Sequence, residues 1–313
     1  MKPFFFALIA IIAAFVMVMV WLEKKEGTTV SKPIPLGGAD YCKVAPAFPK
    51  KFGLRMPYGV DLRQQGYMGL AIIEGNPGGK TLRLPEWEQA GYLGPHAFDQ
   101  NGNIYVAPTP NINIDFNPPE KQNIVYIVGS QTGEMKKLIE LPWASPPTAN
   151  NPFGLVGLTY DCDTESLYAA SLAGSTFREE KGRIFRIDLK SGKVADQLEG
   201  LDVLGLGVFN GSSGKRLYFA SARASEVYSI GLKDSGNFRN DKRLEFSLAA
   251  GSQGAFDKGH RIQFSGPNQM TVKAIEFSYS LIAASDPRRN IYSYVYDPQQ
   301  DAWTLSGVQG ASQ

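Results

Sequence analysis

The feature that most constrains the fold is a strand-turn-strand pattern that recurs along the chain. Its first half is a short run of β-favouring and small residues, which in the first three copies follows a turn rich in Asp, Asn, Gly and Ser. Such turn residues tolerate positive φ angles and hydrogen-bond their own backbone, so they indicate β-hairpins. Four segments carry this half of the pattern: residues 103–107, 166–171, 216–221 and 280–285.

A second strand-like segment follows each copy, and it contains an aromatic residue and leads into a polar turn. The aromatic residues Tyr126, Phe185, Tyr228 and Tyr292 are 59, 43 and 64 residues apart. Spacings of this size are the periods of four-stranded blades with variable loops. Residues 138–143, which end one unit, are similar to residues 81–87, and this indicates one further unit before it. The pattern predicts an all-β fold, a β-propeller with five repeats, and leaves a sixth blade open. A β-sandwich, the main alternative, would not be expected to repeat one pattern five times.

Composition agrees with this fold class and excludes some functions. The 313 residues include 33 Gly and 20 Pro, which suits many short strands better than long helices. The net charge is only +2, so the basic footprint of a nucleic-acid-binding protein is missing, and we expect no nucleic-acid partner. Two Cys and two His leave little room for a zinc site built from those ligands.

The N-terminus predicts a membrane anchor. Residues 4–22 are all apolar, and as a helix they would span roughly 28 Å, about the thickness of the hydrocarbon core of a bilayer. No small-x-small cleavage site follows them, as it would in a cleavable signal peptide. The predicted organisation is an anchor at residues 1–26, a tether at 27–38 and a propeller at 39–313. Lysines flank the apolar run on both sides, so charge alone leaves the orientation open, and we expect an extracytoplasmic propeller, periplasmic or on the cell surface.

One stretch of the second repeat carries a resemblance to a known family. Residues 94–107, read as GPHAFDQNGNIYVA, are similar to the Pro and D-x-x-G-x-L-Y-V-A pattern of the SMP-30/strictosidine-synthase/NHL-like propellers. The likeness covers about 140 residues and implies a propeller fold, which in that group hosts lactonases, synthases, lyases and binding scaffolds. Its calcium-dependent members use Glu, Asn and Asp at the channel mouth, and those residues do not map one by one onto this chain. A divalent metal such as calcium is therefore implied only if the protein is a hydrolase of this kind.

Loop lengths predict where a ligand would bind. Between the second and third strands, the spacing of matched residues is 21 in the second repeat and 17 in the third, but 10 in the fourth and fifth. The extra residues, 108–122 and 172–181, would emerge on one face of the propeller. Binding residues concentrate on such loops, although neutral insertions there are also tolerated.

The two histidines are the sharpest chemical feature of the sequence. His96 begins the predicted inner strand of the second blade, at the rim of the central channel. His260 reaches the same rim if residues 261–264 form an inner strand, and lies further out if residues 270–277 do. Two imidazoles across a channel could bind a metal or act as acid and base. The alternative is two separate histidines with structural roles. Nearby candidates for ligand binding are Asn151, Arg288 and Arg289.

Two functions follow as hypotheses. The first is a membrane-anchored, extracytoplasmic propeller that binds a small ligand or a protein partner through its loop-rich face. The second is a lactonase- or esterase-like hydrolase with a site at the channel mouth. A purely structural subunit of an envelope complex is a third reading. Cys42 and Cys162 could form a disulfide outside the cytoplasm or remain free thiols, and the sequence leaves this open.

Overall fold

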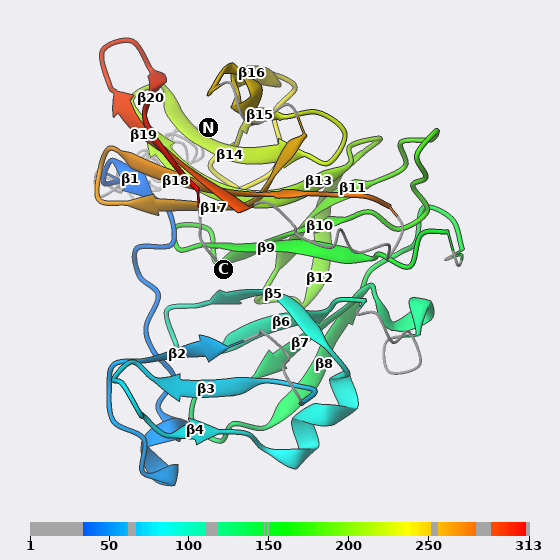
Figure 1. Cartoon of the computed structure of the whole chain (residues 1–313), viewed down its shortest axis with the longest axis vertical. Coiled ribbons are helices and arrows are strands. Elements are labelled where there is room, and N and C mark those ends of the chain that lie inside the picture. The colour runs from blue at the N-terminus through cyan, green and yellow to red at the C-terminus, as the bar shows by residue number, and fades with distance from the viewer. Residues whose placement is uncertain are drawn as a thin grey trace, which may run out of the picture. The chain divides into compact units, whose positions relative to one another are not determined.

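A computed structural model of the chain describes residues 34–61, 67–110, 118–146, 148, 150–251, 256–279 and 289–310 (Figure 1). The chain divides into two units, Met1–Ile34 and Pro35–Gln313, and the second unit contains all the strands described below. The predicted anchor, with its apolar residues 4–22, lies outside the described residues. Within the described ranges, no helix is long and apolar enough to cross a membrane.

The described residues form five antiparallel sheets that follow one another along the chain, as the colour sequence of Figure 1 shows. Sheet 1 contains β2 (Tyr58–Asp61), β3 (Ala71–Glu74) and β4 (Thr81–Leu82). Sheet 2 contains β5 (Leu93–Phe98), β6 (Ile104–Pro108), β7 (Ile124–Val128) and β8 (Met135–Glu140), and sheet 3 contains β9 (Leu155–Asp161), β10 (Ser166–Ser171), β11 (Arg183–Asp188) and β12 (Lys193–Glu199). Sheet 4 contains β13 (Val203–Gly211), β14 (Gly214–Ser221), β15 (Glu226–Gly231) and β16 (Arg243–Ser247), with β1 (Gly37–Gly38) added beside β13. Sheet 5 contains β17 (Asp257–Ser265), β18 (Gln269–Glu276), β19 (Arg289–Asp297) and β20 (Ala302–Gly310). The short 3₁₀ helices are η1 (Phe48–Phe52), η2 (Pro85–Ala90), η4 (Pro119–Lys121) and η5 (Leu248–Gly251). The predicted all-β, five-bladed propeller is confirmed.

The hydrophobic core is divided among the junctions between successive sheets. Each cluster joins the apolar faces of two neighbours, as sheets stacked face to face require. Trp87 and Ile104 lie between sheets 1 and 2, Phe185 lies between sheets 2 and 3, Phe219 lies between sheets 3 and 4, and Tyr292 lies between sheets 4 and 5. Among the described side chains, no corresponding cluster joins sheet 5 to sheet 1. Sheet 5 accordingly alternates buried and accessible residues along its strands, because one of its faces is not covered by another sheet.

The innermost strands approach one another closely at glycines. A Cβ atom at Gly157 in β9 would lie 2.4 Å from the carbonyl oxygen of Leu204 in β13. A Cβ atom at Gly205 in β13 would lie 2.9 Å from the carbonyl oxygen of Gly259 in β17. Only glycine permits this backbone spacing, so these residues set how tightly the sheets gather around the central axis.

Residues 37–48 form an N-terminal strap that passes from sheet 4 to sheet 1. It begins as β1, which pairs with the inner strand β13. The Val44 N–H then donates to the Asp99 carbonyl of the β5–β6 turn at 3.2 Å, and the Phe48 N–H donates to the Ser130 carbonyl of the β7–β8 turn at 2.8 Å. The Phe48 ring finally enters the core between sheets 1 and 2. In Figure 1 this segment is the blue ribbon that runs from β1 towards η1 and β2. The strap therefore connects the last sheets of the propeller to the first.

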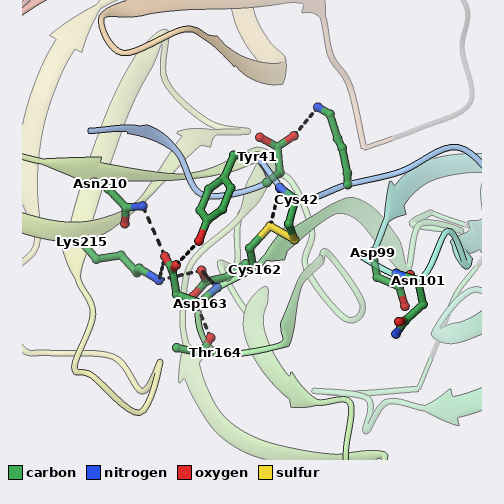
Figure 2. Close-up of a disulfide and its surroundings, with 12 residues drawn as sticks. Tyr41, Cys42, Asp99, Asn101, Cys162, Asp163, Thr164, Asn210 and Lys215 are labelled. Atoms are coloured by element: carbon green, nitrogen blue, oxygen red, sulfur yellow. Dashed lines mark hydrogen bonds and ion pairs between the residues drawn. A yellow bond between two sulfur atoms is a disulfide. The ribbon is translucent and has the colours of Figure 1, made fainter. Parts of the chain in front are cut away.

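A disulfide fixes the middle of the strap to sheet 3. Cys42 is bonded to Cys162 in the β9–β10 turn, 120 residues further along the chain (Figure 2). The Cys162 N–H also donates to the Ala39 carbonyl at 2.8 Å. The sequence left the pairing open, because two cysteines that far apart carry no signal of their distance in space.

Beside the disulfide lies a buried ion cluster (Figure 2). The Lys215 ammonium from β14 is 2.6 Å from a carboxylate oxygen of Asp161 and 2.6 Å from one of Asp163. Asp163 also accepts from the Tyr41 hydroxyl of the strap at 2.6 Å and from the Asn210 amide at 3.3 Å. Lys215 holds the pKa of Asp163 below its usual value, although burial opposes this. Asp161 and Asp163 thus belong to the hairpin turn between β9 and β10, and the cation they bind is a lysine from the next sheet.

Three details of the sequence prediction need correction. The second strand of the fifth blade is β18, whereas the prediction assigned residues 280–285, which lie outside the described residues. The second and third strands of the fifth blade are therefore separated by residues 277–288, whereas the prediction left only residues 286–290 between them. The last two residues of the predicted tether form β1 and pair with the propeller.

We predict that the double substitution Cys42→Ser/Cys162→Ser lowers the free energy of unfolding of the full chain by about 2–5 kcal/mol. The bond closes a loop of 120 residues, so its loss restores conformational freedom to the unfolded chain. Urea denaturation in detergent, followed by tryptophan fluorescence, measures the change. The wild-type protein treated with a reductant should fall to the same midpoint, and an unchanged midpoint in both samples would contradict the prediction.

Candidate functional site

A cavity of about 690 Å³ lies along the axis of the propeller, and it is lined by the inner strands β5, β9, β13 and β17. At one end it reaches Tyr92 and Thr109, beside the connection that follows β6. At the other end it reaches Asp40 and Lys43 of the strap. Ligand pockets typically measure about 300–1,000 Å³, so the cavity can hold a small molecule.

Both histidines line this cavity. His96 comes from β5 and His260 from β17, 164 positions later in the sequence. β17 is the inner strand of its sheet, so of the two possibilities that the sequence left open, residues 261–264 belong to the inner strand and residues 270–277 do not. The structure brings the two imidazoles to one cavity, while their catalytic role stays a prediction.

Irregularities in strand pairing orient both histidine side chains towards the cavity. The pairing of β5 with β6 shifts between Leu93 and His96, where Pro95 cannot donate to the ladder. The pairing of β17 with β18 shifts between Gly259 and Arg261, which makes His260 the extra residue of a bulge. An extra residue breaks the alternation of a strand and redirects its side chain, so His260 and Arg261 can reach the cavity as consecutive residues.

Arg261 is a third basic group in the cavity lining. Its side chain is partly buried, and no hydrogen bond or ion pair joins it to any residue in the described ranges, so its nitrogens keep some contact with solvent. Burial lowers the pKa of its guanidinium. Nothing in the sequence singles out Arg261 beside His260, because two consecutive side chains of a regular strand point to opposite faces.

Burial and positive charge keep both histidines neutral near pH 7. Burial and the charges of Arg261 and Lys43 lower the pKa of His96 to about 4, although an interaction with the Gly94 backbone opposes the shift. Burial and the charges of Arg261 and Arg289 lower the pKa of His260 to about 4 as well. The His260 side chain is accessible to solvent, so the neighbouring charges of Arg261 and Arg289 are the firmer cause of its lowered pKa, and loss of water is the firmer cause for His96.

The other predicted binding residues have different positions. Asn151 is buried, and its amide donates to the carbonyls of Leu172 at 2.9 Å and Ser175 at 2.6 Å, so it holds the loop after β10. It does not line the cavity. Arg289 begins β19 and contributes its charge at His260. Arg288 lies outside the described residues.

The loop after β10, residues 172–182, is fixed by a buried network. Asp202 accepts from the Gly182 N–H at 2.9 Å, from Arg223 Nε at 2.7 Å and from the Tyr279 hydroxyl at 2.5 Å. The Arg223 guanidinium in turn donates to the Thr176 carbonyl at 2.7 Å. Tyr279 comes from the connection between β18 and β19, so this network joins the loops of three sheets. The predicted loop-rich face is therefore ordered in this region and can serve as a rigid rim.

The strand order and the axial cavity define the class of the protein as a β-propeller. No protein-family model matches the chain, and no curated protein matches its sequence. Solved structures of similar fold include a luciferin-regenerating enzyme, with 11% identity, 89% of this chain and 94% of that chain covered, and a TM-score of 0.48. A protein from Lactobacillus plantarum has 12% identity, covers 82% and 67%, and has a TM-score of 0.47. Regucalcin from Agrobacterium tumefaciens, described as a calcium-binding protein, has 11% identity, covers 90% and 93%, and has a TM-score of 0.44. At these scores the likeness carries no argument about activity.

We predict that Arg261→Gln raises the pKa of both histidines, because one cation is removed from beside each imidazole. The His96 value should stay below 6.5, since burial is the larger cause of its shift, and the His260 value should rise further, because that side chain is accessible to solvent. The chain has only two histidines, so two Cε1–H signals in an NMR titration report the result directly. Lys273→Gln is the matched control, because Lys273 pairs with Arg261 across the strands and does not line the cavity.

The lowered pKa values of the two histidines also predict how the free energy of unfolding depends on pH. Unfolded histidines protonate near pH 6.5, before the folded ones do, so the free energy of unfolding should fall as the pH drops from 6.5 through about 4. A His96 signal that titrates near 6.5 in the folded wild type would contradict its buried, positively charged environment.

Proposed function

We propose that this protein is a membrane-anchored, extracytoplasmic β-propeller that binds a small molecule in its axial cavity, with access from the loop-rich face. One observation carries the proposal: two histidines from distant inner strands, together with Arg261, line a single cavity of about 690 Å³. A few polar groups that converge on one cavity are the usual mark of a ligand site. The ordered loop after β10 supports entry from that face, because a rigid rim can position a ligand.

The location of the domain is the second part of the proposal. The disulfide between Cys42 and Cys162 supports an oxidising compartment, where such bonds persist. The apolar run at residues 4–22 is long enough to span a bilayer. Together they favour a propeller held at the outer side of a membrane by its own N-terminus.

A hydrolase remains the second candidate function, and the paired imidazoles are the observation that favours it. Neutral histidines can accept a proton from water or from a substrate. A pKa of about 4 makes each imidazole a weak base, however, so this arrangement suits hydrogen bonding to a ligand better than proton abstraction. In the described part of the chain, no group of three or more His, Cys, Asp or Glu side chains is arranged to hold a metal.

A cavity-blocking substitution tests the ligand-binding proposal. We predict that some members of a panel of neutral sugars, lactones, carboxylates and phosphate esters shift both histidine NMR signals of the full chain in detergent. Thr271→Trp should weaken that binding at least tenfold, because Thr271 lines the cavity and the indole would fill it. The dissociation constant from the NMR titration is the measurement.

Thr304→Trp is the matched control. Thr304 lies on β20, opposite Val295 on the accessible face of the same sheet, and does not line the cavity. It should bind as the wild type does. A panel in which no compound moves either histidine signal, or a Thr271→Trp protein with wild-type affinity, would overturn the proposal.

The membrane anchor has its own test. We predict that alkaline phosphatase fused to the C-terminus of the full chain is active in a bacterial host, because the enzyme requires an oxidising compartment. The fusion should sediment with membranes, and deletion of residues 4–22 should abolish both activity and sedimentation. An intact but inactive fusion would show that the propeller faces the cytoplasm.

A further inference from the structure

Arg261 differs from the partly or fully buried arginines of sheets 3 and 4, because no oxygen atom of the described ranges accepts a hydrogen bond from it. Arg186 donates to the Asn237 side chain at 2.7 Å, Arg216 to Asp241 at 2.9 Å, Arg223 to Asp202 at 2.7 Å and Arg243 to Asp301 at 2.8 Å. Each of these pairs offsets the loss of water around the guanidinium. Arg261 loses water too, as its lowered pKa shows, but the fold gives it no partner in return.

The surroundings of Arg261 are also positive. One carboxylate lines the cavity, Asp40, and it is already paired with the Lys43 ammonium at 2.5 Å. Arg289 adds a further positive charge near His260. A cationic ligand would be repelled here, and a neutral one would leave the charge of Arg261 uncompensated.

The imidazoles of His96 and His260 add ring N–H donors close to the Arg261 guanidinium. Arg261 lowers the pKa of both His96 and His260, which shows that its charge is close to both rings. The Nδ1 atom of His96 is buried and makes no hydrogen bond within the described ranges, although the Gly94 backbone lies close enough to the imidazole to raise its pKa. A guanidinium offers a planar pair of N–H donors that matches the two oxygens of a carboxylate or phosphate.

We propose that the ligand of the axial cavity is an anion, a carboxylate or a phosphate, which Arg261 binds while His96 and His260 donate further hydrogen bonds. This inference rests on the proposed ligand-binding function and names the chemical class of the ligand. The anion takes the place that Asp202, Asp241 and Asp301 occupy for the other arginines.

The experiment uses the full chain in neutral detergent and three probes: acetate, inorganic phosphate and acetamide, the neutral counterpart of acetate. Histidine NMR titrations at constant ionic strength give the dissociation constants and the histidine pKa values. Acetate, phosphate or both should bind and raise the pKa of both histidines, because a bound anion neutralises Arg261. Acetamide should do neither. The comparison of acetate with phosphate distinguishes the two sources of negative charge.

Substitutions at Arg261 provide the second measurement. Arg261→Gln should weaken anion binding by about tenfold to a hundredfold, the range for loss of a charge-assisted hydrogen-bonded pair. Arg261→Lys should lie between this variant and the wild type, because it keeps the charge and loses the planar donor pair. Lys273→Gln should change the affinity less than threefold, and the circular dichroism of each variant verifies its fold.

The outcomes separate this inference from the proposed function. If acetamide binds as well as acetate, or if Arg261→Gln binds the anions with wild-type affinity, the anion assignment is wrong and the cavity remains a ligand site. If only neutral compounds of the larger panel move the histidine signals, the anion assignment is again wrong. If no probe and no panel compound moves them, both proposals fall.

Discussion

The N-terminal strap is the contact on which the rest of the propeller depends. Hydrophobic clusters hold sheets 1 to 5 together in succession, but no such cluster among the described residues joins the last sheet to the first. The strap crosses from β13 to the core of sheet 1 by main-chain hydrogen bonds, one disulfide and the buried Lys215 cluster. Many propellers close with a strand from the opposite terminus in the same blade. Here the closure is a covalently fixed segment that runs beneath several sheets, and an oxidising compartment would preserve it.

The cavity follows from how the inner strands are built. Gly157 and Gly205 let successive backbones approach, while a register shift in each of the four inner strands interrupts the regular ladder. In β9 and β13 both faces of the strand are covered by neighbouring sheets, and the lining there carries no charged or imidazole group: it is apolar or backbone except for the hydroxyls of Thr159 and Tyr160. In β5 and β17 the bulges instead carry His96, His260 and Arg261. The inner strands β9 and β13 therefore contribute mainly packing contacts, whereas β5 and β17 contribute the basic side chains of the cavity.

The sequence predicted the features that repeat and missed those that arise from contacts between distant segments. Turn chemistry and aromatic spacing located the strands of sheets 2 to 4, because each blade is a local unit. Residues 280–285 misled the prediction of the fifth blade, since they match the repeated pattern more closely than β18 does. The true strand, Gln269–Glu276, alternates polar and apolar residues because only one of its faces is buried. The disulfide and the charge partners of Asp163 were beyond sequence reasoning, as both depend on where the strap lies.

The accessible face of sheet 5 connects the closure of the propeller with the chemistry of its cavity. Arg261 and Lys273 pair across the strands on that face, opposite to the buried face that carries Val272 and Ile262. A sheet packed against it would have to desolvate both cations, at a free-energy cost that apolar contacts would not offset. The open junction thus leaves an unpaired guanidinium beside a cavity. A side chain that would destabilise a closed propeller is retained here in the position where an anionic ligand can compensate its charge.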